Sequence, residues 1–177
     1  MKNKTLDEYL EEDCPILFIN GDIEEKTYLN FAQELRYKLS LGISPIKLYI
    51  NSGGGELESA LAIIDDFSLV ESKGKEIWTI AIGQASSSAA LILAYGSKRF
   101  ATPNSVMMLH PISYDLGENE HQSTKTYVNF ADKVYNNIMT SLAVKCGRKQ
   151  AKQVQKFLRE VRDGLWLDVD EAKNFGL

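Results

Sequence analysis

The sequence predicts an α/β protein, and three apolar runs separated by two helical patterns are the basis of that prediction. Residues Ile16–Gly21, Ile46–Asn51 and Glu76–Gly83 are short apolar runs typical of buried strands. Between them, Thr27–Ser40 carries apolar residues at helical spacing, and the segment that follows Gly55 has a stripe of the same period. Strands that alternate with helices in this way favour a parallel sheet with right-handed crossovers, covered on both faces.

Further elements are expected towards the C-terminus. A mostly apolar helix, two short strands, a long helix and two closing helices are predicted at Ser86–Tyr95, Arg99–Thr102, Val106–Leu109, Ser123–Cys146, Gln150–Val161 and the run DVDEAKNFGL. The apolar stripe of the long helix is wider than one sheet face needs. Two interpretations of it stay open: the helix is wedged into the monomer's own core, or it also packs against another subunit.

Composition is typical of a single globular domain. A chain of 177 residues with 44% apolar and 25% charged residues can build one core, so residues 1–177 are treated as one domain with a short N-terminal segment at 1–14. The net charge of −4 gives no general attraction to nucleic acid or to a membrane surface. Without a recognisable signal peptide or an apolar run of membrane-spanning length, a cytoplasmic location is expected. Cys14 and Cys146 stand apart and predict neither a disulfide nor a zinc site.

A serine cluster and a histidine are the first candidates for chemistry. Ser86, Ser87 and Ser88 stand where a strand is expected to give way to a helix, a place that presents a hydroxyl at the end of a sheet. Serine is also a good helix cap, and the sequence leaves the nucleophile and the cap near even. His110 follows another expected strand and is the natural base for such a serine. The second histidine, His121, lies in a polar run typical of a solvated loop.

Three glycines, Gly53–Gly55, lie between a strand and a helix, where backbone N–H groups can approach a ligand closely. A phosphate cradle is disfavoured because Glu56 follows the glycines and would repel phosphate. An oxyanion hole and a simple tight turn both remain open.

A third group should orient the imidazole of a base, and carboxylates usually do so. From the residues alone, four candidates cannot be separated: Asp163, Glu160, Asp168 and Asp170.

Taken together, these motifs resemble the ClpP family, the proteolytic subunits of Clp proteases, which are self-compartmentalised serine peptidases. The resemblance runs from Pro15 to the C-terminus, and the stretches LYINSGGGELESALAIIDDF, TIAIGQASSSAALILAYGSKRFATPNSVMMLH and DEAKNFGL carry it. It implies a ClpP/crotonase-like fold of repeated β-β-α and βαβ units, with residues 123–146 as a long interface helix that helps to pair rings.

The resemblance also assigns roles. It implies that Ser87 is the nucleophile and His110 the general base. The backbone N–H groups of Gly55 and Ser88 fall on the oxyanion donors. The aspartate of the family's Arg-Asp pair falls on Asp163, although the stretch that follows is one residue longer than usual, and Glu160 is the fallback. Neither a metal nor another cofactor is implied.

Partners follow from the same resemblance. It implies heptameric rings stacked in pairs as a tetradecamer, peptide substrates from unfolded proteins, and a AAA+ unfoldase. A charged stretch replaces the family's glycine-rich segment that joins rings, and the N-terminus that docks the unfoldase is shorter. Such departures fit a divergent branch of the family, for example a phage-type one. Two other functions stay open: a crotonase-type acyl-CoA enzyme and a catalytically silent ring subunit.

Overall fold

The computed structural model describes residues 13–111 and 121–177, apart from the side chains of residues 121–125, 127 and 131. The expected α/β architecture is confirmed. In chain order the elements are β1 (Ile16–Asn20), α2 (Glu25–Ser40), β2 (Ile46–Ser52), α3 (Leu57–Glu71), β3 (Ile77–Ser86), α4 (Ser88–Tyr95), β4 (Lys98–Ala101), β5 (Val106–Leu109), α5 (His121–Lys145), α6 (Ala151–Val161), β6 (Leu165–Leu167) and α7 (Val169–Phe175).

The strands of the described residues form one mixed sheet in the order β1-β2-β3-β5-β6. Strand β3 is long enough to pair with two partners in succession along one side: β4 joins its first half and β5 joins its end. The pairings among β1, β2, β3, β4 and β5 are all parallel, whereas β6 runs antiparallel to β5. The sequence pattern did not predict β6, because three residues are too few to show a period of two.

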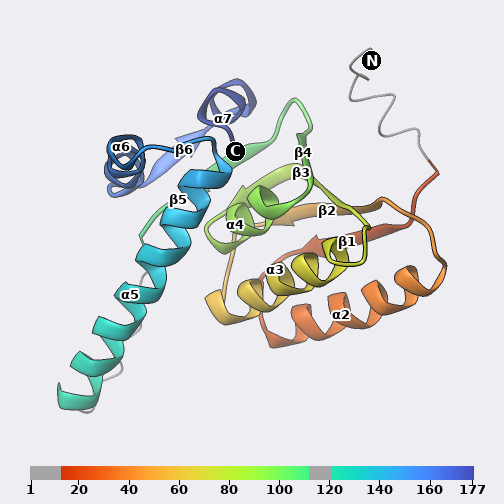
Figure 1. The fold of residues 1–177 in the computed structure, drawn as a ribbon, viewed down its shortest axis with the longest axis horizontal. Helices are drawn as coiled ribbons and strands as arrows, with labels where there is room; N and C mark the ends of the chain where they lie inside the picture. Colours follow the sequence, from red (N-terminus) through yellow and green to blue (C-terminus); the bar gives the residue numbers. More distant parts are fainter. Residues whose placement is uncertain (1–12, 112–120) are drawn as a thin grey trace.

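Helices α2 and α3 lie side by side across one face of the sheet, as Figure 1 shows, and α4 packs against α3, α5 and β3. Helix α4 is the central element of the core, since every residue from Ser88 to Ala94 is buried. A helix that is apolar all round and buried all round has little freedom to shift, because interiors are close-packed. Its first turn is therefore held firmly in place.

The outer face of β1 is exposed, so the expectation of a sheet covered on both faces is wrong for this strand. Leu17 and Ile19 point into the core, whereas Ile16 is 40% and Phe18 64% exposed. Phe18 stacks on Tyr49 of the neighbouring strand, with ring centroids 5.6 Å apart. No helix of the described chain covers these apolar side chains, because α2 and α3 occupy the opposite face.

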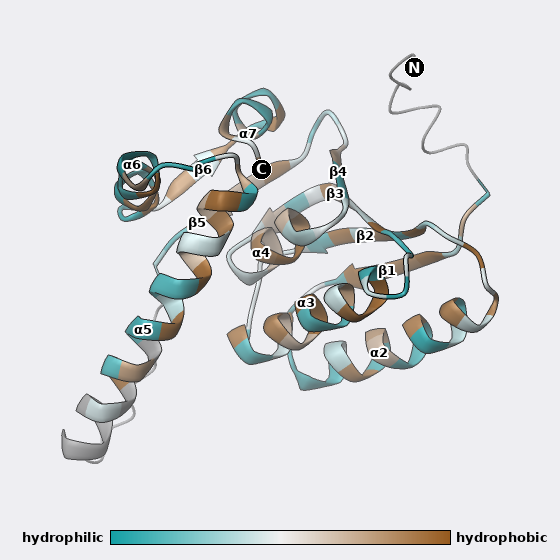
Figure 2. Ribbon diagram, viewed as in Figure 1, coloured by the Kyte–Doolittle hydropathy of each residue, from teal (hydrophilic) through white to brown (hydrophobic). Residues whose placement is uncertain are grey.

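Helix α5 joins the core only near its C-terminal end. Buried residues gather there, namely Met139, Leu142 and Ala143, and the buried Cys146 follows directly after the helix. The rest of the helix projects beyond the sheet (Figure 1), apolar and polar colours alternate along it (Figure 2), and Phe130 is 64% exposed. The expectation of a loop at His121 is wrong, since α5 begins at that residue. Neither α5 nor another helix in the described ranges is long and apolar enough to cross a membrane.

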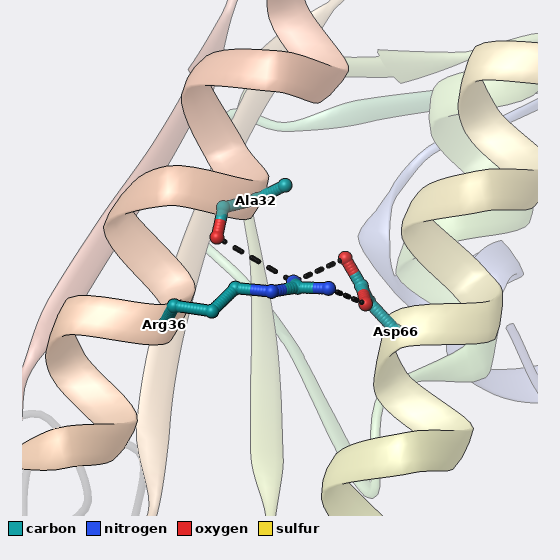
Figure 3. Close-up of polar contacts among 3 residues, drawn as sticks. All are labelled: Ala32, Arg36 and Asp66. Carbon is teal, nitrogen blue, oxygen red and sulfur yellow. Dashed lines mark hydrogen bonds and ion pairs between the residues drawn. The ribbon is translucent and has the colours of Figure 1, made fainter.

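An ion pair joins α2 to α3 (Figure 3). Both guanidinium nitrogens of Arg36 donate to the Asp66 carboxylate, at 2.7 and 2.8 Å, and one of them also lies 3.4 Å from the carbonyl oxygen of Ala32. The Asp66 side chain is 5% exposed, whereas that of Arg36 is 54% exposed. The hydrogen bonds to Asp66 raise the pKa of Arg36, so the guanidinium stays charged at every pH at which the protein is folded. A bidentate pair of this kind fixes the orientation of the two helices.

We expect Arg36→Ala to destabilise the fold, because it leaves a buried carboxylate without its donors. The free energy of unfolding should fall by about 1–3 kcal/mol, towards the lower end because water reaches the Arg36 side of the pair. Urea denaturation measures the loss. Gln33→Ala, on an exposed position of the same helix, is the matched control and should change stability by less than about 0.5 kcal/mol. Equal stability of the two variants would contradict a structural role for the ion pair.

Candidate active site

The three serines occupy three different structural positions. Strand β3 extends to Ser86, three residues beyond the predicted end at Gly83, and α4 begins at Ser88, so Ser87 alone forms the turn. The Ser86 hydroxyl is engaged by the Gln84 side-chain amide at 2.9 Å, and the Ser88 hydroxyl donates to a carbonyl oxygen at 3.2 Å. No serine side chain caps α4, so the capping interpretation is wrong. The Ser87 hydroxyl is the one left at the end of the sheet.

Ser87 has an unusual backbone conformation. Its φ of 56° makes it the one residue other than glycine, among those described, with a positive φ. Such conformations cost on the order of 1–3 kcal/mol and persist only where the surroundings impose them. Two hydrogen bonds do so here: the Ser87 N–H donates to the Met108 carbonyl at 2.7 Å, and the Ser87 carbonyl accepts from Ala90 at 3.0 Å. A strained strand-to-helix turn of this kind presents a nucleophile outward.

His110 lies within hydrogen-bond distance of this serine. The Nε2 atom of His110 and the Oγ atom of Ser87 are 2.8 Å apart. The pairing of β5 with the end of β3 explains the approach, because parallel strands bring the residues that follow them to one edge of the sheet. In the tautomer with its proton on Nδ1, the imidazole accepts the serine hydroxyl proton at Nε2. That is the geometry of a general base and its nucleophile.

The glycine loop lies directly against the serine turn. Gly54 and Gly55 have φ values of 105° and 149°, which side chains rarely tolerate. A Cβ atom on Gly54 would lie 2.6 Å from the Cβ of Ser87, and one on Gly55 would lie 2.1 Å from the carbonyl oxygen of Ile23. Ile23 holds the loop by donating to the Gly54 carbonyl at 2.9 Å and accepting from Glu56 at 2.7 Å. These two positions of the loop therefore have no space for any residue larger than glycine.

The backbone N–H groups of Gly55 and Ser88 are available to a ligand. Ser88 is the first residue of α4, where an N–H has no acceptor within its helix. Among residues 13–111 and 121–177, neither N–H donates a backbone hydrogen bond. The hydrogen bond from the Ser88 hydroxyl to the Gly55 carbonyl, 3.2 Å, keeps the two segments adjacent. Two N–H donors beside a serine hydroxyl are what an oxyanion hole requires.

Asp163 does not contact His110 in this structure. Asp163 is exposed, and no hydrogen bond within the described part of the chain links its carboxylate to the imidazole. The antiparallel ladder pairs Leu109 with Leu165, so one further step sets Gly164 opposite His110. Asp163 is one residue outside that position. Its role as the third group stays a prediction.

Two of the other carboxylate candidates have partners elsewhere, and the third, Asp170, is exposed in the first turn of α7. Glu160 is exposed and pairs with Lys156 on its own helix at 3.6 Å. Asp168 caps α7 by accepting the Glu171 N–H at 2.8 Å. No carboxylate in the described ranges is hydrogen-bonded to the imidazole, and the same ranges hold no cluster of three or more side chains suited to a metal ion.

Sequence reasoning missed one residue that contacts the backbone of His110. The Tyr135 hydroxyl of α5 donates to the His110 carbonyl oxygen at 3.3 Å. In the sequence Tyr135 is one of several apolar residues at helical spacing, so nothing distinguishes it from those that only pack. The contact depends on how α5 lies against β5, which local sequence does not encode.

Comparison with known proteins gives a family for this constellation. A family model described as Clp protease matches residues 3–177, which is nearly the whole chain. The chain belongs to the Clp protease family. This Clp family member is 40% identical to the ATP-dependent Clp protease proteolytic subunit of Carsonella ruddii (strain PV) over 106 residues, covering 58% of the chain and 53% of that relative.

A second relative matches a longer part of the chain. The ATP-dependent Clp protease proteolytic subunit 1 of Thermobifida fusca (strain YX) is 33% identical over 134 residues, which cover 75% of the chain and 57% of that protein. The chain thus spans little more than half the length of the curated relatives it matches. The Clp family assignment and the ClpP-like fold agree with each other.

We expect Gly55→Ala to displace the glycine loop from Ile23, since the new Cβ would overlap a backbone carbonyl that has no room to move. The free energy of unfolding should fall by about 1–3 kcal/mol or more. Gly53→Ala is the matched control in the same loop: the atom nearest to its Cβ is 3.9 Å away and its φ is not positive, so the loss should be within about 0.5 kcal/mol. Chemical denaturation of both variants compares them, and similar losses would show that the loop is not confined as described.

Proposed function

We propose that the chain is a serine-type endopeptidase that hydrolyses peptide bonds of unfolded proteins and peptides. The 2.8 Å contact between the Ser87 hydroxyl and the His110 imidazole carries the proposal, because it joins a strained serine to the one base beside it. The Clp protease family and the names of both relatives support the same class of reaction.

The reaction would proceed in two halves. Ser87 Oγ attacks the peptide carbonyl carbon while His110 Nε2 takes the hydroxyl proton. The tetrahedral intermediate then collapses, the C–N bond breaks, and the imidazolium returns the proton to the departing amine. Water attacks the remaining ester while His110 takes a proton from it. The bond to Ser87 Oγ then breaks, the imidazolium returns that proton to Oγ, and the peptide acid leaves.

The developing oxyanion would lie between the Gly55 and Ser88 N–H groups. A donor of this kind is worth about 3–4 kcal/mol of barrier when it is held in place before the reaction. Here the buried helix α4 fixes the Ser88 amide, and the Ile23 contacts fix the glycine loop. The donors would need little rearrangement as charge develops on the substrate oxygen.

We propose that Asp163 orients the imidazole in the working enzyme. The aspartate is next to Gly164, the residue that would lie opposite His110 if the β5–β6 register continued by one step, and this placement supports the proposal. Catalytic hydrogen bonds are often long or poorly aligned before substrate binds. The exposed position of Asp163 leaves its side chain unhindered.

We propose further that the working form is an oligomer of this chain, with stacked heptameric rings that enclose the site and a AAA+ unfoldase that delivers substrates in the cytoplasm. Two surfaces support self-assembly. The uncovered face of β1 exposes Ile16 and Phe18, and the projecting half of α5 exposes Phe130. Large apolar side chains in such positions are typical of protein–protein contacts.

The direct test of the proposal is covalent labelling. A fluorophosphonate should react with the wild-type chain, and Ser87→Ala should abolish both labelling and cleavage of a fluorogenic peptide. Mass spectrometry of the labelled protein should place the adduct on Ser87. His110→Ala should slow labelling by about 1,000-fold or more, because the hydroxyl loses its base.

Ser86→Ala is the matched control, since the neighbouring hydroxyl only contacts Gln84, and it should be labelled at nearly the wild-type rate. A wild-type chain that is never labelled would sink the proposal. If it then binds coenzyme A esters, the crotonase-type function is favoured, and if it forms rings without any turnover, the silent subunit is favoured.

Asp163→Asn tests the third group. An amide in place of the carboxylate should lower kcat by about 100-fold or more, as expected when the base loses its orienting charge. Glu160→Gln should leave kcat near the wild-type value, because Glu160 pairs with Lys156 on the solvent side of α6. Steady-state kinetics with one model peptide compares the two variants. A larger loss in Glu160→Gln than in Asp163→Asn would transfer the role to Glu160.

A further inference from the structure

We infer that Tyr135 is a positioning residue for the general base: from helix α5, its hydroxyl fixes the backbone at His110 so that the imidazole stays against Ser87. The inference rests on the proposed function, since it assigns a role in the same site. It adds a residue that no motif of the chain points to. The observation behind it is the 3.3 Å hydrogen bond from the Tyr135 hydroxyl to the His110 carbonyl oxygen.

The backbone at His110 has little support from the sheet. The last pair in the β5–β6 ladder joins Leu109 to Leu165, and His110 is one residue beyond it. A residue just past a strand end can tilt, and the imidazole would move with it. A displacement of about 1 Å at a catalytic group can cost on the order of 100-fold in rate. The Tyr135 hydroxyl donates at the point where the ladder stops.

Tyr135 is itself held in place by its surroundings. Tyr135 is half-buried against the core, next along α5 to the turn that contributes Met139 and Leu142. A second hydroxyl contact, from Tyr95 of α4 to Ser141 of α5 at 2.7 Å, ties the same helix to the one that carries Ser88. Burial raises the pKa of Tyr135 to about 12, so its hydroxyl remains a donor throughout the range in which a peptidase works.

The hydrogen bond from Tyr135 matters because of how the imidazole of His110 is held. In this structure no carboxylate of the described residues is hydrogen-bonded to the imidazole, and Ser87 is the one hydrogen-bond partner that these residues give to the ring. Its backbone position then decides whether Nε2 meets the Ser87 hydroxyl. A neutral donor to the carbonyl sets that position without adding charge to the ring.

Tyr135→Phe tests the inference, because it removes the hydroxyl and keeps the ring. With a short model peptide we expect kcat and the rate of fluorophosphonate labelling both to fall about three- to ten-fold, with KM unchanged. A residue that only packs would lower the melting temperature and leave the labelling rate of the folded protein intact. Should Tyr135→Phe not fold, Tyr135→Met fills the space with a flexible side chain and should show the same loss.

Tyr95→Phe is the matched control. It removes the other tyrosine hydroxyl that holds α5 but does not contact the His110 segment, so the labelling rate should stay near the wild-type value. Equal losses in Tyr95→Phe and Tyr135→Phe would overturn the inference in favour of general docking of the helix. An unchanged rate in Tyr135→Phe would overturn it outright. Both results presuppose that wild-type Ser87 is labelled, so failure of the proposed function is recognised separately.

Discussion

The positive φ of Ser87 is the constraint on which the rest of the site depends. Strand β3 extends as far as Ser86 and α4 begins at Ser88, so one residue must reverse the direction of the chain. The cost of that conformation, about 1–3 kcal/mol, is offset by the burial of α4 from Ser88 to Ala94 and by the hydrogen bond from Ser87 to Met108. A helix less buried than α4 would let the turn relax and withdraw the hydroxyl.

Each neighbouring element serves this turn. The absence of a side chain at Gly54 lets the glycine loop approach the Cβ of Ser87, and the parallel pairing of β5 with the end of β3 sets His110 beside the hydroxyl. Ser87, His110 and the N–H groups of Gly55 and Ser88 thus come from three loops at one edge of the sheet, the place where ligands bind in open α/β folds. The ion pair between α2 and α3 acts further away, by keeping the layer that covers the sheet in register.

Much of this could be predicted from the sequence. Apolar periodicity predicts the early strands and helices, and the motifs predict that Ser87 and His110 share a site. Local patterns failed where pairing or packing decides. The end of β3 at Ser86 depends on β5 as a partner, and β6 is too short for a period. Whether a tyrosine on α5 packs or donates depends on the tertiary arrangement, as Tyr135 shows.

A crystal structure with a peptide boronate bound tests the central claim most directly, because a boronate forms a tetrahedral adduct with a reactive serine. The account predicts a bond from boron to Ser87 Oγ, with one boronate oxygen about 2.7–3.1 Å from the N–H nitrogens of both Gly55 and Ser88. His110 Nε2 should remain within hydrogen-bond distance of the adduct. A boronate bound at another serine, or an adduct on Ser87 whose oxygens all point away from the two amides, would contradict it.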